Sequence, residues 1–150
     1  MFSQNRFLHN AIVLKKAYDT MLDEIGTEYG MTRIEIEVLA FILNNPKYNT
    51  ARDIVEYRMI AKSHVSKATD TLTEKGLLRG EQDDYDKRRI RLIPTEKSAE
   101  ILSTIRTHQL YFASRLIEGM SAEEQTYVFR LTSQIADNAQ KMLAEQTSSH

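Results

Sequence analysis

Apolar residues recur every three or four positions over much of this chain, which is the spacing of one face of a helix. The first such run extends from Leu8 to Ile25 and loses its regularity between Gly26 and Gly30. Thr32 and Glu35 follow at the spacing of a capping box, which favours the start of a second helix there. That helix is expected to end at Asn44-Asn45-Pro46 and to turn four side chains inward: Ile36, Leu39, Ala40 and Leu43.

Two short helices joined by a tight turn are predicted next. Thr50 is a candidate N-cap for the first, which cannot extend much beyond Arg58. After a tight connection over residues 59–62, Ser63 is a candidate cap for the second, and Gly76 ends it by relieving left-handed strain. The core face of this second helix carries Val65, Ala68 and Leu72. The side chains left facing outward are Lys62, Ser63, Ser66, Lys67 and Asp70, with His64 to one side.

A β-hairpin with a long charged tip is expected after Gly76. Residues 77–79 and 90–93 are short enough to be strands, and the polar stretch between them contains Gly80 and three Asp. Four cations occupy the five positions 87–91. Pro94-Thr95 is expected to open a third long helix that stops at Gly119, and Ser121 with Glu124 forms a capping box for a last long helix.

Composition indicates a single soluble domain. The chain has 150 residues, no internal repeat and no segment that reads as a linker. No apolar run approaches the length of a membrane span and the amino terminus lacks the pattern of a signal peptide, so we expect a cytoplasmic protein. The absence of Cys excludes disulfides, thiolate metal sites and thiol redox sensing.

The distribution of charge is more informative than its sum. The formal net charge is −1, but residues 50–97 carry 11 Lys and Arg against 9 Asp and Glu, a net charge of +2. The remaining residues carry 9 against 12, a net charge of −3. The predicted short helices and hairpin are therefore the basic part of the chain.

A helix pair with a tight turn, followed by a hairpin, is the layout of a winged helix-turn-helix, whose second helix enters the major groove of DNA. Arg residues on the wing can enter the minor groove, and Asp86 is placed to hold Arg88 in position beforehand. We expect base contacts from Ser63, His64, Ser66 and Lys67, a minor-groove contact from Arg88, and phosphate contacts from Lys62, Arg79, Lys87 and Arg89. The competing interpretations are an ordinary solvated helix face and a salt-bridged hairpin without a partner.

The residues from Thr32 to Ser98 resemble the MarR family of bacterial transcriptional regulators. The family's wing motif, Asp-x-x-Asp-x-Arg, is matched by Asp83, Asp86 and Arg88. The stretch "SHVSKATDTLTEKGLLRG" is similar to the family's recognition helix and the start of its wing. The chain departs from the family pattern after the wing, where Pro94 and Ser98 replace a Leu and a Gly.

The resemblance implies a mainly α fold with a small β-hairpin wing. All residues 1–150 would form a single MarR-like domain, with the winged helix-turn-helix DNA-binding region at 32–97 and dimerisation helices at 5–29 and 98–146. It further implies a homodimer on double-stranded DNA that recognises a pseudo-palindromic operator, acts as a repressor, and is released by a small-molecule effector.

Other functions have less support in the sequence. No phosphate-binding loop or catalytic motif is present, so we expect neither an enzyme nor a cofactor. The four histidines (His9, His64, His108 and His150) show no helical pairing that would bind a metal. The sequence leaves two alternatives for an effector. Either a pocket binds one, with His9, Tyr18, His108 and Tyr111 as candidate lining residues, or the protein has no effector. The main alternative is a winged-helix module that binds an acidic protein instead of DNA.

Overall fold

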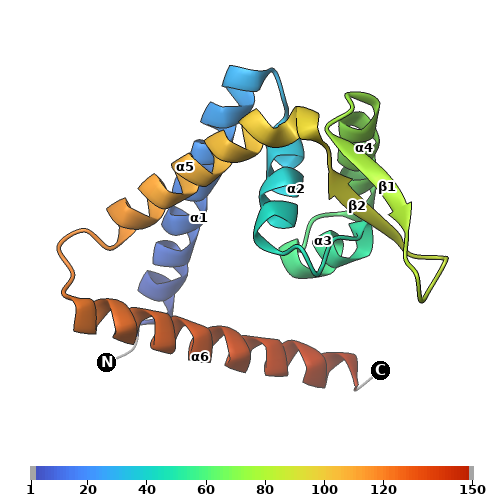
Figure 1. Ribbon diagram of the computed structural model, residues 1–150. Coiled ribbons are helices and arrows are strands. Elements are labelled where there is room, and N and C mark those ends of the chain that lie inside the picture. The colour runs from blue at the N-terminus through green and yellow to red at the C-terminus, as the bar shows by residue number, and fades with distance from the viewer. Residues whose placement is uncertain (1–2, 149–150) are drawn as a thin grey trace. The chain divides into compact units, whose positions relative to one another are not determined.

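The computed structural model describes residues 3–148, and the chain has two compact units, residues 1–112 and 113–150. The fold is mainly α with one two-stranded antiparallel sheet, which confirms the predicted fold class (Figure 1). The elements follow the predicted order. They are α1 (Gln4–Tyr29), α2 (Arg33–Asn44), α3 (Ala51–Arg58), α4 (Lys62–Glu74), β1 (Leu78–Gln82), β2 (Ile90–Pro94), the 3₁₀ turn η1 (Glu96–Ser98), α5 (Ala99–Leu116) and α6 (Ala122–Thr147).

The core of the first unit forms around α2, whose apolar residues are almost all buried. Helix α2 contacts α1, α4 and β2, and α3 contacts α4 and β2. Of the predicted inward residues, Ile36, Leu39 and Ala40 are fully buried, and Leu43 is partly buried against the core. The same holds for the core face of α4, where Val65 and Leu72 are fully buried and Ala68 is nearly so. Apolar burial of this extent is the main stabilising term of the unit.

Only the second half of the apolar stripe on α1 is covered within the first unit. Met21, Leu22 and Ile25 are buried, whereas Leu8 and Ile12 are exposed. The helix itself extends as predicted, because Ser3 caps its start and Gly30, with φ of 65°, ends it in the left-handed conformation. The amino-terminal half of α1 therefore presents an uncovered apolar face.

The hairpin begins and ends differently from the sequence prediction. β1 continues through Gly80 to Gln82, and Pro94 is the last residue of β2, paired with Leu78, instead of the first residue of a helix. Pro94 is tolerated there because it lies at the end of the strand, where its missing N–H removes no pairing within the ladder. The long helix α5 begins only at Ala99, after η1.

Capping boxes fix the starts of α2 and α3. Thr32 and Glu35 exchange the two expected hydrogen bonds at α2, and Thr50 and Asp53 do the same at α3. The segment before α3 also pairs with the wing, because the Leu92 amide donates to the Asn49 carbonyl over 2.7 Å. The base of the wing is thus attached to the amino end of α3.

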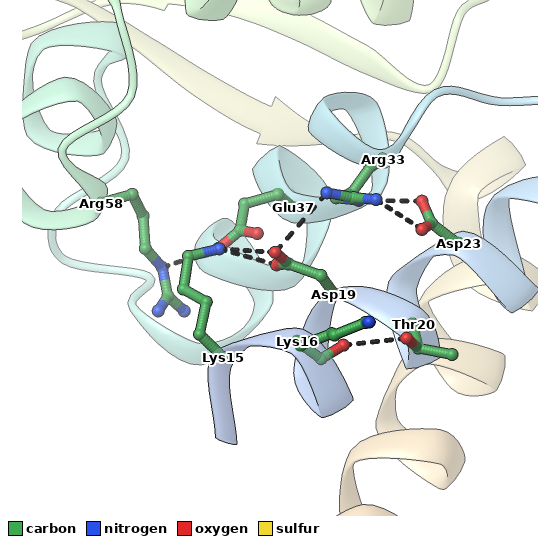
Figure 2. Close-up of polar contacts among 8 residues, drawn as sticks. All are labelled: Lys15, Lys16, Asp19, Thr20, Asp23, Arg33, Glu37 and Arg58. Atoms are coloured by element: carbon green, nitrogen blue, oxygen red, sulfur yellow. Dashed lines mark hydrogen bonds and ion pairs between the residues drawn. The ribbon is translucent and has the colours of Figure 1, made fainter. Parts of the chain in front are cut away.

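A cluster of charged side chains joins α1, α2 and α3 (Figure 2). Asp19 of α1 contacts Lys15 at 2.7 Å and Arg33 of α2 at 3.5 Å, and Arg33 also pairs with Asp23. Glu37 of α2 lies 3.4 Å from Nε of Arg58, the last residue of α3. Arg58 Nε is buried and makes no hydrogen bond within the described residues, so this contact is electrostatic with imperfect geometry.

The second unit consists mainly of α6. Gly119, with φ of 82°, and the capping box of Ser121 and Glu124 precede it, as the sequence predicts. None of the described residues of α6 is buried, and its stripe of Val128, Leu131, Ile135 and Met142 is exposed. An amphipathic helix with an uncovered apolar stripe is typical of an element that packs against a partner.

Candidate nucleic-acid interface

Helix α4 begins two residues earlier than a Ser63 cap would place it, and Ser63 does not cap it. The N-cap position is Ala61, which has no side-chain hydrogen bond, and the amides of His64 and Val65 donate to the Ala61 carbonyl. The reason lies in the turn, where Met59 adopts a left-handed conformation with φ of 52° and brings the chain into the helix before Ser63 is reached. The first turn of α4 therefore lacks the side-chain cap that commonly satisfies free amides.

The predicted outward face of α4 is exposed to solvent along its whole length. Lys62, Ser63, His64, Ser66 and Lys67 are all exposed on this face. Asp70 is exposed as well, and within residues 3–148 no ion pair joins it to an arginine. Thr69, which the sequence pattern did not place, is buried and its hydroxyl donates to the Ser66 carbonyl. The face offers hydrogen-bond donors and acceptors, together with two lysines and one aspartate.

Two aspartates shape the tip of the wing. Asp83 Oδ1 accepts hydrogen bonds from the amides of Tyr85 at 2.9 Å and Asp86 at 3.1 Å, so its side chain holds the tip loop in a turn. These amides favour the charged carboxylate and lower the pKa of Asp83 below its usual value. The wing motif of Asp and Arg residues thus has a structural role at its first position.

Asp86 contacts Arg88 in the way that their spacing predicts. Asp86 Oδ1 accepts from the Arg88 amide at 3.1 Å and from the Arg88 Nε at 3.2 Å. The Arg88 side chain is 92% exposed, so its guanidinium remains accessible while one edge is held by the carboxylate. Lys87 next to it is exposed too. The exposed tip therefore carries a cation whose orientation is already restricted.

The other two arginines expected to bind phosphates already have acidic partners. Arg79 pairs with Glu81, two residues along β1, at 2.7 Å. Arg89 reaches back to Asp53 of α3 at 3.6 Å. Sequence reasoning missed the second contact, because nothing in the local pattern links residue 89 to residue 53.

A groove lies between the amino end of α3 and the wing. Its lining is balanced in charge, since it contains three arginines and three acids. The lining residues are Thr50, Ala51, Arg52, Asp53, Glu56, Asp86, Arg88, Arg89 and Ile90. Arg52, which no sequence motif singles out, pairs with Glu56 one turn along α3.

Within residues 3–148, no three His, Cys, Asp or Glu side chains come together as a metal site would require, and His150 lies outside this range. None of the helices in that range is long and apolar enough to cross a membrane.

Tyr18, a candidate effector contact, packs edge-on against Phe112 with ring centroids 5.8 Å apart. Burial raises the Tyr18 pKa, which suits a packing role.

Comparison with known proteins identifies the region that carries these features. The model of the MarR family matches residues 29–89, from the end of α1 to the tip of the wing. This region is similar to the MarR family. The match covers the helix pair and most of the wing, so the resemblance first noted from the wing motif and the α4 sequence is confirmed.

Solved MarR-family structures share the fold over most of the chain. A MarR family transcriptional regulator of Listeria monocytogenes, crystallised with a 26-mer DNA, has a TM-score of 0.79 at 20% identity and covers 92% of this chain and 89% of its own. A MarR protein of Peptoclostridium difficile has a TM-score of 0.77 at 23% identity, with 95% and 94% covered. A MarR regulator of Methanosarcina mazei has a TM-score of 0.76 at 13% identity, with 95% and 94% covered. No curated protein matches the sequence.

Proposed function

We propose that this protein is a sequence-specific DNA-binding transcriptional regulator. The observation that carries the proposal is the combination of an exposed polar face on α4 with a wing whose Arg88 is held by Asp86 yet remains accessible. The winged helix-turn-helix fold uses these two elements for the major groove and its flank. The Listeria monocytogenes protein of the same fold, which was crystallised with DNA, supports the proposal.

Each exposed residue of the interface has a role in this proposal. Ser63, His64, Ser66 and Lys67 contact base edges in the major groove, and Arg88 enters the minor groove while Asp86 orients it. Lys62 and Lys87 bind phosphates. Arg79 joins them by exchanging Glu81 for a phosphate, which costs little because both partners of that pair are largely exposed.

We further propose a homodimer on a pseudo-palindromic operator. Residues 32–97 are then the DNA-binding region, and residues 5–29 and 98–146 supply the dimerisation helices of one functional domain. The uncovered apolar side chains of α1 and of α6 support this assignment, because each needs a partner surface. Two recognition helices about 34 Å apart would meet successive major grooves. Repression, and release by a small-molecule effector, complete the proposal.

Selection of bound sequences from a random duplex pool tests the function directly. The purified protein is mixed with the pool at a low and a high salt concentration, without added ligand. We expect a two-fold-symmetric site to be enriched, and its affinity to fall steeply with salt because phosphate contacts release counterions. The spacing of the half-sites then reports the geometry of the dimer.

A winged-helix module that binds another protein is the second candidate. The charge balance of the groove between α3 and the wing favours it, because a groove without net positive charge suits a protein surface better than it suits DNA. Under this alternative, the random pool yields no enriched sequence even at low salt. Mutation of Arg88 then weakens capture of an acidic partner protein and has no effect on any DNA.

A further inference from the structure

Arg89 differs from the other cations of the wing because its side chain turns away from the tip and toward α3. Its Nη2 lies 3.6 Å from Asp53 Oδ2, and about half of the side chain is exposed. The Asp53 side chain is only 12% exposed. Arg88 next to it is far more exposed, and its partner Asp86 belongs to the same loop. Of these two arginines, Arg89 is the one whose ion pair joins the wing to another element.

The carboxylate that faces Arg89 also belongs to the capping box of α3. Asp53 Oδ2 accepts hydrogen bonds from the Thr50 amide at 3.0 Å and from the Thr50 hydroxyl at 2.7 Å. One oxygen atom thus caps the helix and attracts the guanidinium. A shielded carboxylate gains more from a neighbouring cation than an exposed one does, because less water screens the pair.

The backbone around Arg89 links the same two parts of the molecule. The Arg89 amide donates to the Asp86 carbonyl at 2.9 Å, and its carbonyl accepts from the Asp83 amide at 3.0 Å, so it lies where the tip loop closes. Thr50 forms an isolated bridge with Arg91, and Leu92 donates to Asn49. Strand β2 lies against α3 as a result (Figure 1).

We propose that Arg89 is a positioning residue that fixes the wing to the amino end of α3 through Asp53, and that it is not a phosphate ligand. The effect of this positioning role on DNA affinity rests on the proposed function. An Arg89 that moved to a phosphate would leave the shielded Asp53 carboxylate without its cation. By holding the base of the wing, Arg89 sets where Arg88 and the tip meet the DNA.

The effect of Asp53→Asn on DNA affinity has opposite signs under the two roles. The amide oxygen of Asn can still accept from Thr50, so the cap is kept while the attraction for Arg89 is lost. If Arg89 positions the wing, the substitution weakens binding to the selected operator about two- to fivefold, the range of an exposed ion pair. If Arg89 is a phosphate ligand, the substitution frees it and removes a negative charge, so equal or tighter binding overturns the proposal.

The salt dependence of binding separates the roles a second time. Arg89→Met, which keeps the length of the side chain, is expected to weaken binding without changing the slope of log affinity against log salt. Arg89→Lys restores part of the affinity, because its charge still faces Asp53. Combined with Asp53→Asn, Arg89→Met causes no further loss. A slope that falls by about one for each Arg89 removed identifies a phosphate ligand instead.

A measurement without DNA keeps the test independent of the proposed function. The Leu92 amide bridges β2 and Asn49, so its hydrogen exchange followed by NMR reports release of the wing base from α3. Both Arg89→Met and Asp53→Asn are expected to accelerate this exchange severalfold. Arg52→Ala is the matched control, because it removes an arginine of the same groove that pairs only within α3. Unchanged Leu92 exchange in both variants overturns the positioning role even if the protein binds no DNA.

Discussion

Arg88 is a highly exposed cation of the wing tip, and its neighbours hold its side chain in position. Asp83 holds the tip loop by two backbone amides, and Asp86 then holds Arg88 by its amide and its Nε. A cation that is oriented in advance loses less side-chain entropy on binding. The acids beside the basic cluster therefore support its function and do not simply neutralise it.

Replacing Arg88 by Ala should weaken binding to every DNA sequence. We expect a loss of about tenfold or more and a smaller salt slope, because a minor-groove cation is removed. Lys67→Ala is the informative contrast, since a residue on the α4 face should change which bases are preferred. Titration of both variants against the selected site and scrambled DNA checks this. An Arg88→Ala protein with unchanged affinity and slope would refute the wing's role.

Glu37 should make the stability of the protein depend on pH. Burial is the main cause that raises its pKa above the usual 4.5, and the nearby Arg58 only partly offsets it. The contribution of such a group to stability is full below the unfolded pKa and is lost as the pH rises through the folded pKa. We therefore expect the free energy of unfolding of Glu37→Gln, relative to the wild type, to increase as the pH rises from about 4 to about 7.

Urea unfolding at several pH values measures this difference, with Glu28→Gln as the matched substitution of an exposed carboxylate. At low pH the protonated Glu37 of the wild type also leaves Arg58 without a charged partner, so the attraction to Arg58 is already included in the pH trend. The sign of the pH trend is therefore the decisive observation. If the free energy of unfolding of Glu37→Gln relative to the wild type stays constant or falls over this range, burial does not raise the Glu37 pKa.

At the scale of elements, α4 is distinguished by its uncapped start. Helices α2 and α3 both begin with capping boxes, whereas α4 begins at Lys62 and its N-cap residue, Ala61, makes no side-chain hydrogen bond. An uncapped helix terminus is less stable but leaves its amides open to an anion such as a DNA phosphate. The helix proposed to enter DNA thus begins with a first turn that no side chain caps.

Adding a cap to α4 should improve stability and reduce DNA binding together. Ala61→Ser is expected to raise the free energy of unfolding by about 0.5–1 kcal/mol, because the hydroxyl can accept from a free amide of the first turn. The same hydroxyl then competes with a phosphate. Chemical unfolding and DNA titration measure the two effects.

In Ser63→Ala the stability should change by less than about 0.5 kcal/mol, whereas a loss near 1 kcal/mol would show that Ser63 caps the helix after all.

At the scale of the whole molecule, the proposed dimer explains why so much apolar surface is uncovered on α1 and α6. An aspartate in the α6 stripe should prevent association, because it would bury an unpaired charge. We expect Ile135→Asp to be monomeric by sedimentation and to lose at least tenfold in affinity for the two-fold-symmetric site. Ser133→Asp, about 200° around the helix from residue 135, is the control that should remain dimeric. A wild-type protein that sediments as a monomer while binding that site would contradict the dimer.

The sequence by itself determined the order of the elements and the faces that they bury. Capping boxes such as Thr32 with Glu35, the core face of Val65, Ala68 and Leu72, and the contact of Asp86 with Arg88 all involve residues within a few positions of each other. Local spacing therefore contains the information that such features need. The exposed face of α4 follows from the same periodicity, although its role in DNA binding stays a prediction.

Only the tertiary structure decided the features that depend on residues far apart in the sequence. Pairing with Leu78 kept Pro94 in the hairpin, and the approach of β2 to α3 brought Arg89 to Asp53. Burial of Glu37 against Arg58 likewise required α2 and α3 to pack. A side chain's partner across such distances is set by how the elements pack, and no local pattern records that.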